Sequence, residues 1–177
     1  MRLFVGIAIP PDVAASVGRF VARVRDWAPL RFTAIDDMHV TTKFIGEVAD
    51  DRVGEIETAL AAITRPPFEV AVRGLGWFPD AGAPRVFWAG VDAPELAALA
   101  ADTERALVPL GVDTETRAYT PHLTLARIDR KAKLDALRAE IARTPSPDFG
   151  AFRADGFALY ETRSGHHVRR TFPLVAG

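Results

Sequence analysis

The stretch His39-Val40-Thr41-Thr42 recurs as His122-Leu123-Thr124-Leu125 in the other half of the 177-residue chain. Two of the four histidines therefore stand in the same His-apolar-Thr setting. Side chains alternate between the two faces of a strand, so each histidine shares a face with its threonine, while Val40 and Leu123 point toward the core. The repeat predicts two facing lobes, each contributing one such strand to a common cleft.

Strand and helix patterns alternate along the chain without the regular rhythm of a parallel sheet. Helices are predicted from Pro11, with helical spacing out to Trp27, after Asp50, at about 94–107 and at 134–141. Strands are predicted at 2–9, 31–34, 39–48, 68–75, 85–91, 122–128, 149–161 and 167–174. This distribution favours an α+β fold with two pseudo-symmetric lobes of antiparallel sheet, helices on the outer faces and a central cleft. Because no low-complexity linker divides the chain, residues 1–177 are expected to form a single bilobal domain.

Composition excludes several classes of protein. The 22 basic and 23 acidic side chains give a formal net charge of −1, which argues against broad attraction to nucleic acid or anionic membrane. The absence of cysteine rules out disulfides, thiolate nucleophiles and cysteine-based zinc sites, and fits a cytoplasmic protein. The opening apolar run ends at Pro10-Pro11-Asp12, too early for a secretory signal or membrane span. We expect a buried strand there and no membrane association.

The paired motifs suit acid–base chemistry on an anion. Imidazole has an ordinary pKa of about 6.5, so one ring can donate a proton while another accepts one near neutral pH. Two imidazoles and two hydroxyls facing one cleft would surround a small tetrahedral group such as a phosphodiester. Its hydrolysis needs a base for the incoming water, an acid for the departing oxygen and donors for the nonbridging oxygens. The residues alone leave open which histidine is the acid.

Further motifs stand around this pair in a fixed order. They are Arg2-Leu3-Phe4-Val5, the run from His39 to Glu47, Gly76-Trp77-Phe78-Pro79, Arg85-Val86-Phe87-Trp88-Ala89-Gly90, Pro121-His122-Leu123-Thr124-Leu125-Ala126-Arg127, and Leu159-Tyr160-Glu161-Thr162. Taken together, over nearly the whole chain, they resemble the RNA 2′,3′-cyclic phosphodiesterases of the two-histidine (2H) phosphoesterase superfamily. Members of this group were first described as 2′-5′ RNA ligases.

The resemblance implies an activity and a division of roles. It implies metal-independent hydrolysis of an RNA or oligonucleotide 2′,3′-cyclic phosphate end to a 2′-phosphate, without a cofactor. His39 would be the proton donor and His122 the proton acceptor. Thr41, Thr124 and Arg127 would hold the phosphate.

Two positions conflict with a regular strand. Arg127 lies five residues after His122 and so falls on the opposite face, which demands a bulge or strand end near Ala126. Thr42 stands where the family usually has an apolar residue. Its inward-facing hydroxyl therefore needs a local partner, such as a backbone carbonyl.

The remaining titratable candidates favour structural interpretations. His166 and His167 are adjacent, so in a strand they would face opposite ways, and we expect solvated turn residues. Glu47 has the wrong parity to join the histidines, and the motifs lack the spacing of a hydrolytic metal site. We therefore predict no metal.

Other side chains near the motifs have less specific expectations. Lys43 shares the parity of His39 and is expected either at the cleft edge or in solvent, whereas Phe44 is expected in the core. The large aromatics at strand positions are more typical of core packing than of nucleobase stacking. These are Trp77, Phe78 and Trp88.

Two alternative functions use the same cleft. A 5′-hydroxyl in place of water would make the reaction a 2′-5′ RNA ligation, since the same acid and base serve both directions. A noncatalytic RNA-end-binding module would instead tolerate replacement of His39 or His122. A closed two-lobed chain completes its own site, so a monomer is expected.

Overall fold

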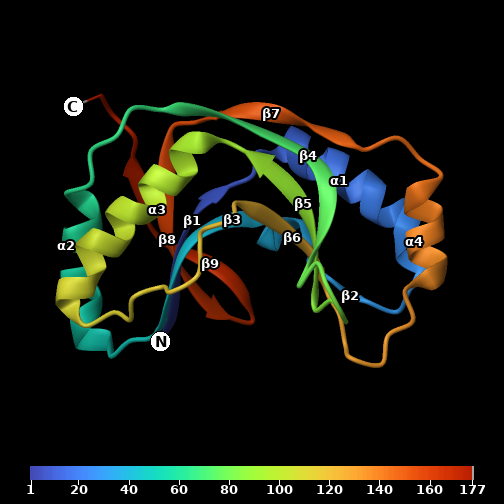
Figure 1. Ribbon diagram of the computed structural model, residues 1–177. Coiled ribbons are helices and arrows are strands. Elements are labelled where there is room, and N and C mark those ends of the chain that lie inside the picture. Colours follow the sequence, from blue (N-terminus) through green and yellow to red (C-terminus); the bar gives the residue numbers. More distant parts are fainter. Residues whose placement is uncertain (177) are drawn as a thin grey trace.

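The computed structural model describes residues 1–176 and contains two antiparallel sheets (Figure 1). We call them sheet A and sheet B. Sheet A has the order β3-β1-β8-β9, with β1 at Arg2–Ala8, β3 at His39–Glu47, β8 at Gly156–Arg163 and β9 at Gly165–Pro173. Sheet B has the order β2-β6-β5-β4-β7, with β2 at Arg31–Phe32, β4 at Phe68–Phe78, β5 at Val86–Asp92, β6 at His122–Arg127 and β7 at Asp148–Ala154. The α+β fold with two lobes is thus confirmed.

Across residues 1–176, four α-helices cover the outer faces of the sheets. They are α1 at Pro11–Val24, α2 at Val53–Ala61, α3 at Pro94–Leu107 and α4 at Asp135–Ala142. Prolines at the first turns of α1 and α3 fit helix starts, because proline needs no amide partner there. Within residues 1–176, no helix combines the length and the apolar character needed to cross a membrane.

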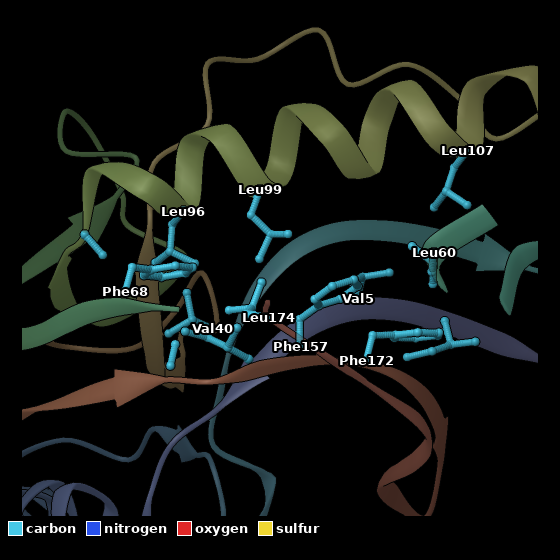
Figure 2. Close-up of a cluster of buried hydrophobic side chains, with 14 of the residues drawn as sticks. Val5, Val40, Leu60, Phe68, Leu96, Leu99, Leu107, Phe157, Phe172 and Leu174 are labelled. Carbon is cyan, nitrogen blue, oxygen red and sulfur yellow. The ribbon is translucent and has the colours of Figure 1, made fainter. Parts of the chain in front are cut away.

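Each lobe has its own hydrophobic core. In sheet A, α2 and α3 pack on the strands, and Figure 2 shows Leu96, Leu99 and Leu107 of α3 directed toward them. In sheet B, α1 and α4 cover the strands, with Val17 and Leu137 fully buried in that core. The helices therefore leave one face of each sheet open for a site.

The two lobes are interleaved along the chain. Helix α1 follows β1 of sheet A but packs on sheet B, and α3 follows β5 of sheet B but packs on sheet A. Strand β4 arches between the lobes beside β7 (Figure 1), so Val70 enters one core and Val72 the other. Neither lobe corresponds to a continuous half of the sequence.

Both motif strands contain a bulge at the fourth motif residue. In β3, Thr41 lies opposite Gly6 and Lys43 opposite Val5, which leaves Thr42 as the extra residue. In β6, Thr124 lies opposite Trp88 and Ala126 opposite Phe87, which leaves Leu125 as the extra residue. An extra residue inverts the faces of all later side chains. The bulge required by Arg127 is confirmed, one residue before Ala126, and a second one occurs in the other lobe.

Several element boundaries differ from the predictions. The stretch 149–161 forms two strands that belong to different sheets, because the chain crosses from β7 to β8 at Asp155. Strand β4 continues three residues past its predicted end at Leu75, since Gly76, Trp77 and Phe78 still pair with β5. Helix α1 ends at Val24 and continues as a 3₁₀ turn to Trp27, whose side chain is 42% exposed.

We predict that Gly6→Ala destabilises the protein. A Cβ at Gly6 would stand 2.6 Å from the Val40 carbonyl oxygen, so β3 must shift where it carries the first motif. Overpacking against backbone typically costs about 1–3 kcal/mol. The free energy of unfolding in urea should fall by that amount.

The matched control is Gly54→Ala in α2, where an added Cβ meets nothing within 4 Å. Alanine is favoured over glycine in helices, so this variant should gain up to about 1 kcal/mol. Equal stability of Gly6→Ala and the wild type would show that β3 does not depend on the close approach at Gly6.

Candidate active site

The two motifs meet across the open faces of the sheets. His39 and Thr41 are half-buried on the face of sheet A that points away from α2 and α3, while Val40 lies in the core beneath them. His122 and Thr124 have the same arrangement on sheet B, above Leu123. Strands β3 and β6 are neighbours in space. The four predicted motif side chains thus belong to one site.

The two imidazoles are held in the same way. Nδ1 of His39 lies 2.7 Å from the carbonyl oxygen of Asp37, and Nδ1 of His122 lies 2.8 Å from that of Thr120. A carbonyl only accepts, so each Nδ1 carries a proton and donates it. In the neutral ring, Nε2 is then unprotonated. Each ring therefore offers Nε2 for proton transfer.

Burial keeps both imidazoles neutral in the free protein. It lowers the pKa of His39 to about 4; the hydrogen bond to Asp37 opposes this shift, and the nearby His166 adds to it. Burial also lowers the pKa of His122; the hydrogen bond to Thr120 opposes this shift, and the Arg127 guanidinium adds to it. An anion bound between the rings would counter both shifts, because negative charge stabilises imidazolium.

An aromatic wall surrounds His39. Its ring centroid lies 4.5 Å from that of Phe4 and 5.6 Å from that of Tyr160, and these two rings stack on each other. His166 completes the wall, with its ring 4.8 Å from His39 and nearly perpendicular to it. The prediction of a solvated turn is wrong for His166, which lies in β9 against the first motif. His167, the next residue of β9, is exposed.

The β8–β9 hairpin also fixes the loop that orients His39. The amide of His166 donates a 2.9 Å hydrogen bond to Oδ1 of Asp37. Gly165 has a φ of +121°, and a Cβ there would lie 3.3 Å from the same oxygen. The hairpin thus holds Asp37 by its side chain, and Asp37 holds His39 by its carbonyl.

Two aromatic side chains flank His122. Phe78 lies with its ring edge-on to the imidazole at 5.0 Å, and Trp88 follows at 6.5 Å. Trp77 points elsewhere and stacks on Phe87 at 4.4 Å. Core packing is therefore right for Trp77, whereas Phe78 and Trp88 line the site.

The bulges decide which later side chains reach the site. Beyond Leu125, the inverted faces place Arg127 on the side of His122, and the effect of its charge on His122 agrees with this position. Beyond Thr42, the same inversion turns Phe44 toward the site and Lys43 toward the core. Phe44 is 63% exposed, so the expectation of a core residue is wrong.

Polar contacts beneath β3 support its bulge. The hydroxyl of Thr42 donates to the Val5 carbonyl at 3.2 Å, which confirms the predicted backbone partner. Lys43 is only 6% exposed; it forms an ion pair with Glu104 of α3 and donates to the Asp113 carbonyl at 2.6 Å. Lys43 is thus neither at the cleft edge nor in solvent.

The segment before the second motif is tied to the first motif. The hydroxyl of Tyr119 donates to the Thr41 carbonyl at 2.9 Å. Burial raises the pKa of Tyr119, so this donor keeps its proton. Together with the bond from Lys43 to Asp113, this contact links the backbone of β3 to the chain entering β6.

A cavity of about 430 Å³ opens beside His39 and His166. Its walls are largely apolar, from the start of α1, from Ile35 and Met38, and from Val168 of β9. Asp36 and Asp37 add carboxylates to the lining. The site can therefore extend from the paired imidazoles into a pocket that disfavours a second anionic group.

Sequence reasoning missed the residues that hold the imidazoles and form the walls. Asp37 and Thr120 act through carbonyls, which leave no mark on side-chain identity. Phe4 and Tyr160 belong to the motifs that carry the family resemblance. Along the first strand, Phe4 shares its face with the small residues Gly6 and Ala8, which is typical of a face without a packed core. This pattern is the sequence signal that could have placed Phe4 at the site.

The chain has a two-lobed α+β fold, and each lobe contributes one imidazole whose Nδ1 donates to a backbone carbonyl. These features are those of a two-histidine phosphoesterase. The sequence model of the protein family described as LigT-like phosphoesterase matches residues 7–88 and 90–169. The chain therefore belongs to this family. The predicted resemblance to 2H phosphoesterases is confirmed.

Named relatives cover nearly the whole chain. The RNA 2′,3′-cyclic phosphodiesterase of Aeropyrum pernix is 35% identical over 170 residues, or 90% of this chain and 96% of its own. That of Methanocaldococcus jannaschii is 31% identical over 165 residues, or 92% of this chain and 91% of its own. A crystal structure of a Thermus thermophilus protein matches 99% of both chains, with 27% identity and a TM-score of 0.83.

We predict that His39 titrates near pH 4 in the free protein and at higher pH when an anion is bound. The lowered pKa means that the ring is neutral at pH 7 and becomes protonated only in acid. Sulfate between the imidazoles should favour imidazolium and raise the pKa. Nitrogen NMR titration with and without sulfate measures this, with His39→Gln to assign the signal. A His39 pKa near 6.5 that does not change when sulfate is added would contradict both the effect of burial and the binding of an anion beside the ring.

Proposed function

We propose that this chain hydrolyses RNA 2′,3′-cyclic phosphate ends to 2′-phosphates. The observation that carries the proposal is the matched pair of imidazoles, each with Nδ1 bonded to a backbone carbonyl and Nε2 left for proton transfer. The names of the relatives support the same activity.

In this reaction the two histidines have opposite tasks. Nε2 of His122 accepts a proton from water as its oxygen attacks phosphorus. The bond from phosphorus to the 3′-oxygen breaks, and Nε2–H of His39 gives that oxygen a proton. The cyclic phosphate brings the negative charge that allows one imidazole to be protonated at neutral pH. The products are a 2′-phosphate and a free 3′-hydroxyl.

The nonbridging oxygens need donors that stay fixed during the reaction. Thr41 and Thr124 share the faces of the two histidines, and we assign their hydroxyls to this role. Arg127 reaches the same face through the bulge and supplies positive charge as negative charge builds up on the phosphoryl oxygens. All of these groups belong to the protein, so the proposed reaction needs no metal or other cofactor.

Two other uses of the site predict different results. In 2′-5′ ligation a 5′-hydroxyl replaces water, and a free 5′-hydroxyl oligonucleotide would be joined rather than left unchanged. An RNA-end-binding module would bind without turnover. Two neutral imidazoles with free Nε2 atoms favour catalysis over binding alone, since a binding module needs no groups for proton transfer.

We also propose that residues 1–177 act as one domain, in the cytoplasm, as a monomer. The interleaved lobes support a single unit, because both cores draw strands and helices from the two halves of the sequence. Since one chain supplies both motifs, a second copy is not needed to complete the site. The cysteine-free sequence fits a reducing compartment.

Replacing either motif histidine should nearly abolish turnover. The measurement is hydrolysis, in EDTA, of an oligoribonucleotide ending in a 2′,3′-cyclic phosphate, with the position of the product phosphate assigned. Each positioned acid or base typically raises the rate by about 10²- to 10⁴-fold. The turnover rates of His39→Ala and His122→Ala should therefore each fall by at least about 10²-fold. The wild type should yield a 2′-phosphate.

The matched control for these variants is His167→Ala, an exposed histidine one residue from the site wall, which should keep full activity. Full activity in both motif variants would mean that the repeated motif is structural. Loss of wild-type turnover in EDTA, restored by a divalent metal, would refute the metal-free mechanism.

The rate should depend on pH in a bell shape whose maximum lies below pH 6.5. The reactive form has one proton on the pair, and its population peaks midway between the two pKa values. Both pKa values lie below the ordinary 6.5, so kcat/KM should rise as the pH falls from 8 and decline again in acid. A flat profile from about pH 5 to 9, or a maximum above 7, would contradict the assignment.

A further inference from the structure

Asp37 joins two parts of the molecule that are far apart in the sequence. Oδ1 of its side chain accepts a 2.9 Å hydrogen bond from the amide of His166, which is 129 residues away. Its backbone carbonyl accepts the Nδ1 proton of His39 at 2.7 Å. The same residue therefore binds the β8–β9 hairpin through its carboxylate and the first motif imidazole through its main chain.

The turn that carries this carbonyl is short and lies at the surface. Residues Ile35–Asp37 form a single 3₁₀ turn, whose N-cap residue Ala34 makes no side-chain cap hydrogen bond. The amide of Asp37 donates to the Ala34 carbonyl at 3.0 Å, and the side chains of Ile35 and Asp36 are exposed. Hydrogen bonds in such turns have poorer geometry than those of an α-helix. The position of the Asp37 carbonyl thus depends on contacts made outside the turn.

The hairpin approaches Asp37 closely enough to supply such a contact. Gly165 pairs with Arg163 at the closed end of the hairpin and has a φ of +121°, which favours glycine. A Cβ at Gly165 would stand 3.3 Å from Oδ1 of Asp37. The ring of His166 also packs edge-on against His39 at 4.8 Å. The hairpin therefore supports the first motif at both the turn and the imidazole.

The two lobes differ at this point. Thr120 has the place of Asp37 before the second motif, and its carbonyl accepts the Nδ1 proton of His122 at 2.8 Å. Its side chain is exposed. In the part of the chain from 1 to 176, the side-chain anchor therefore occurs at the first motif and not at the second.

We propose that Asp37 is a positioning residue for the catalytic acid, because its carboxylate anchors the 3₁₀ turn to the β8–β9 hairpin and so fixes the carbonyl that orients His39. This assignment rests on the proposed function, in which His39 gives its proton to the departing 3′-oxygen. It adds the closed end of a distant hairpin to the groups on which that step depends.

Proton transfer is sensitive to such an anchor. Misplacement of a reacting group by about 1 Å can cost about 10²-fold in rate. The bond to the carbonyl also acts on the charge state of the ring: burial lowers the pKa of His39, and the hydrogen bond to Asp37 opposes that shift. A displaced carbonyl would leave an imidazole that points less well and takes up a proton less readily.

Two other roles for the Asp37 carboxylate give different results. As a negative charge near His39, it would favour imidazolium without holding the turn. As part of the lining of the cavity beside His39, it would contact the substrate directly. Replacement by asparagine separates the charge from the anchor, because the amide oxygen still accepts a hydrogen bond. A separate look at KM and kcat distinguishes substrate contact from positioning.

The test compares two leaving groups of nearly the same shape. One substrate is an oligouridylate ending in a 2′,3′-cyclic phosphate, and the other has sulfur in place of the terminal 3′-oxygen. Water attacks phosphorus in both, and the bond from phosphorus to oxygen or to sulfur breaks. Sulfur departs as a thiolate, which is stable without a proton because thiols have an ordinary pKa of about 8.5. Only the oxygen substrate therefore needs the acid.

Asp37→Ala should lower kcat for the oxygen substrate by about 10- to 100-fold, with KM unchanged. Its kcat for the sulfur analogue should stay within about twofold of the wild type. Asp37→Asn should stay within about twofold on both substrates. His39→Ala shows the pattern of a lost acid, namely a low rate with oxygen and a retained rate with sulfur.

A second variant reaches the same contact from the hairpin. Gly165→Ala places its Cβ against Oδ1 of Asp37 and should also slow the oxygen substrate while sparing the sulfur analogue. The matched control is Gly111→Ala, at another positive φ, where a Cβ meets nothing within 4 Å. Asp26→Ala removes an exposed carboxylate from the 3₁₀ turn after α1. Both controls should keep both rates.

Several outcomes would overturn the proposal. Equal losses on the two substrates in Asp37→Ala would indicate a general structural role. A raised KM with an unchanged kcat would indicate substrate contact, and an Asp37→Asn variant as slow as Asp37→Ala would indicate that the charge is what matters. Full activity of Asp37→Ala would show that the anchor is not needed.

A measurement without turnover keeps this proposal separate from the proposed function. If the wild type hydrolysed neither compound, hydrolysis would be refuted, but nitrogen NMR still reports which nitrogen of neutral His39 carries the proton. That nitrogen is set by the hydrogen bond to Asp37. Asp37→Ala should move part of the proton from Nδ1 to Nε2, and Asp37→Asn should not. An unchanged proton position in Asp37→Ala would overturn the positioning role.

Discussion

The site depends on a single backbone constraint, the extra residue that follows the threonine in each motif strand. Without it, strict alternation would send Arg127 away from His122 and bury Phe44. Before the bulge, the first three motif residues pair regularly with the neighbouring strand, which is β1 for β3 and β5 for β6. After the bulge, each side chain points to the opposite face from the one that regular alternation would give it. Each strand can therefore place its histidine and threonine, and then a third side chain, on the same open face. The side chain that points into the core after the bulge is Lys43 in one lobe and Ala126 in the other.

The relative position of the two lobes is fixed by contacts that do not involve the histidines. Tyr119 and Lys43 connect the backbone of β3 with the segment entering β6, and strand β4 contributes to both cores. The buried ion pair of Lys43 with Glu104 adds a further tie to α3. Losing one partner of such a pair is costly, since it leaves a buried charge uncompensated. The separation of the two imidazoles thus depends on the packing of the whole molecule and not on a hinge between independent halves.

Much of this arrangement follows from local rules, and the errors have two physical causes. The duplicated motif and the proline-initiated helices are readable because they depend on neighbouring residues. Strand parity, taken with the role that the resemblance implies for Arg127, predicts the bulge before it, and the inward-facing position of Thr42 predicts its need for a partner. The same parity rule fails for Lys43 and Phe44, because alternation does not reveal which residue of β3 is extra. Alignment of the two motifs would have transferred the bulge from one lobe to the other. His166 was beyond local reasoning, since its approach to His39 depends on pairing between strands far apart in sequence.

The imidazoles are oriented by main-chain oxygens, and this has a consequence for how the site can change over time. A carbonyl belongs to every residue type, so Asp37 and Thr120 do the same work with unrelated side chains. A substitution at Thr120 therefore leaves the acceptor for His122 in place. A substitution at Asp37 also keeps a carbonyl, but it removes the carboxylate that the β8–β9 hairpin binds. The second motif can thus change the residue that orients its imidazole more freely than the first.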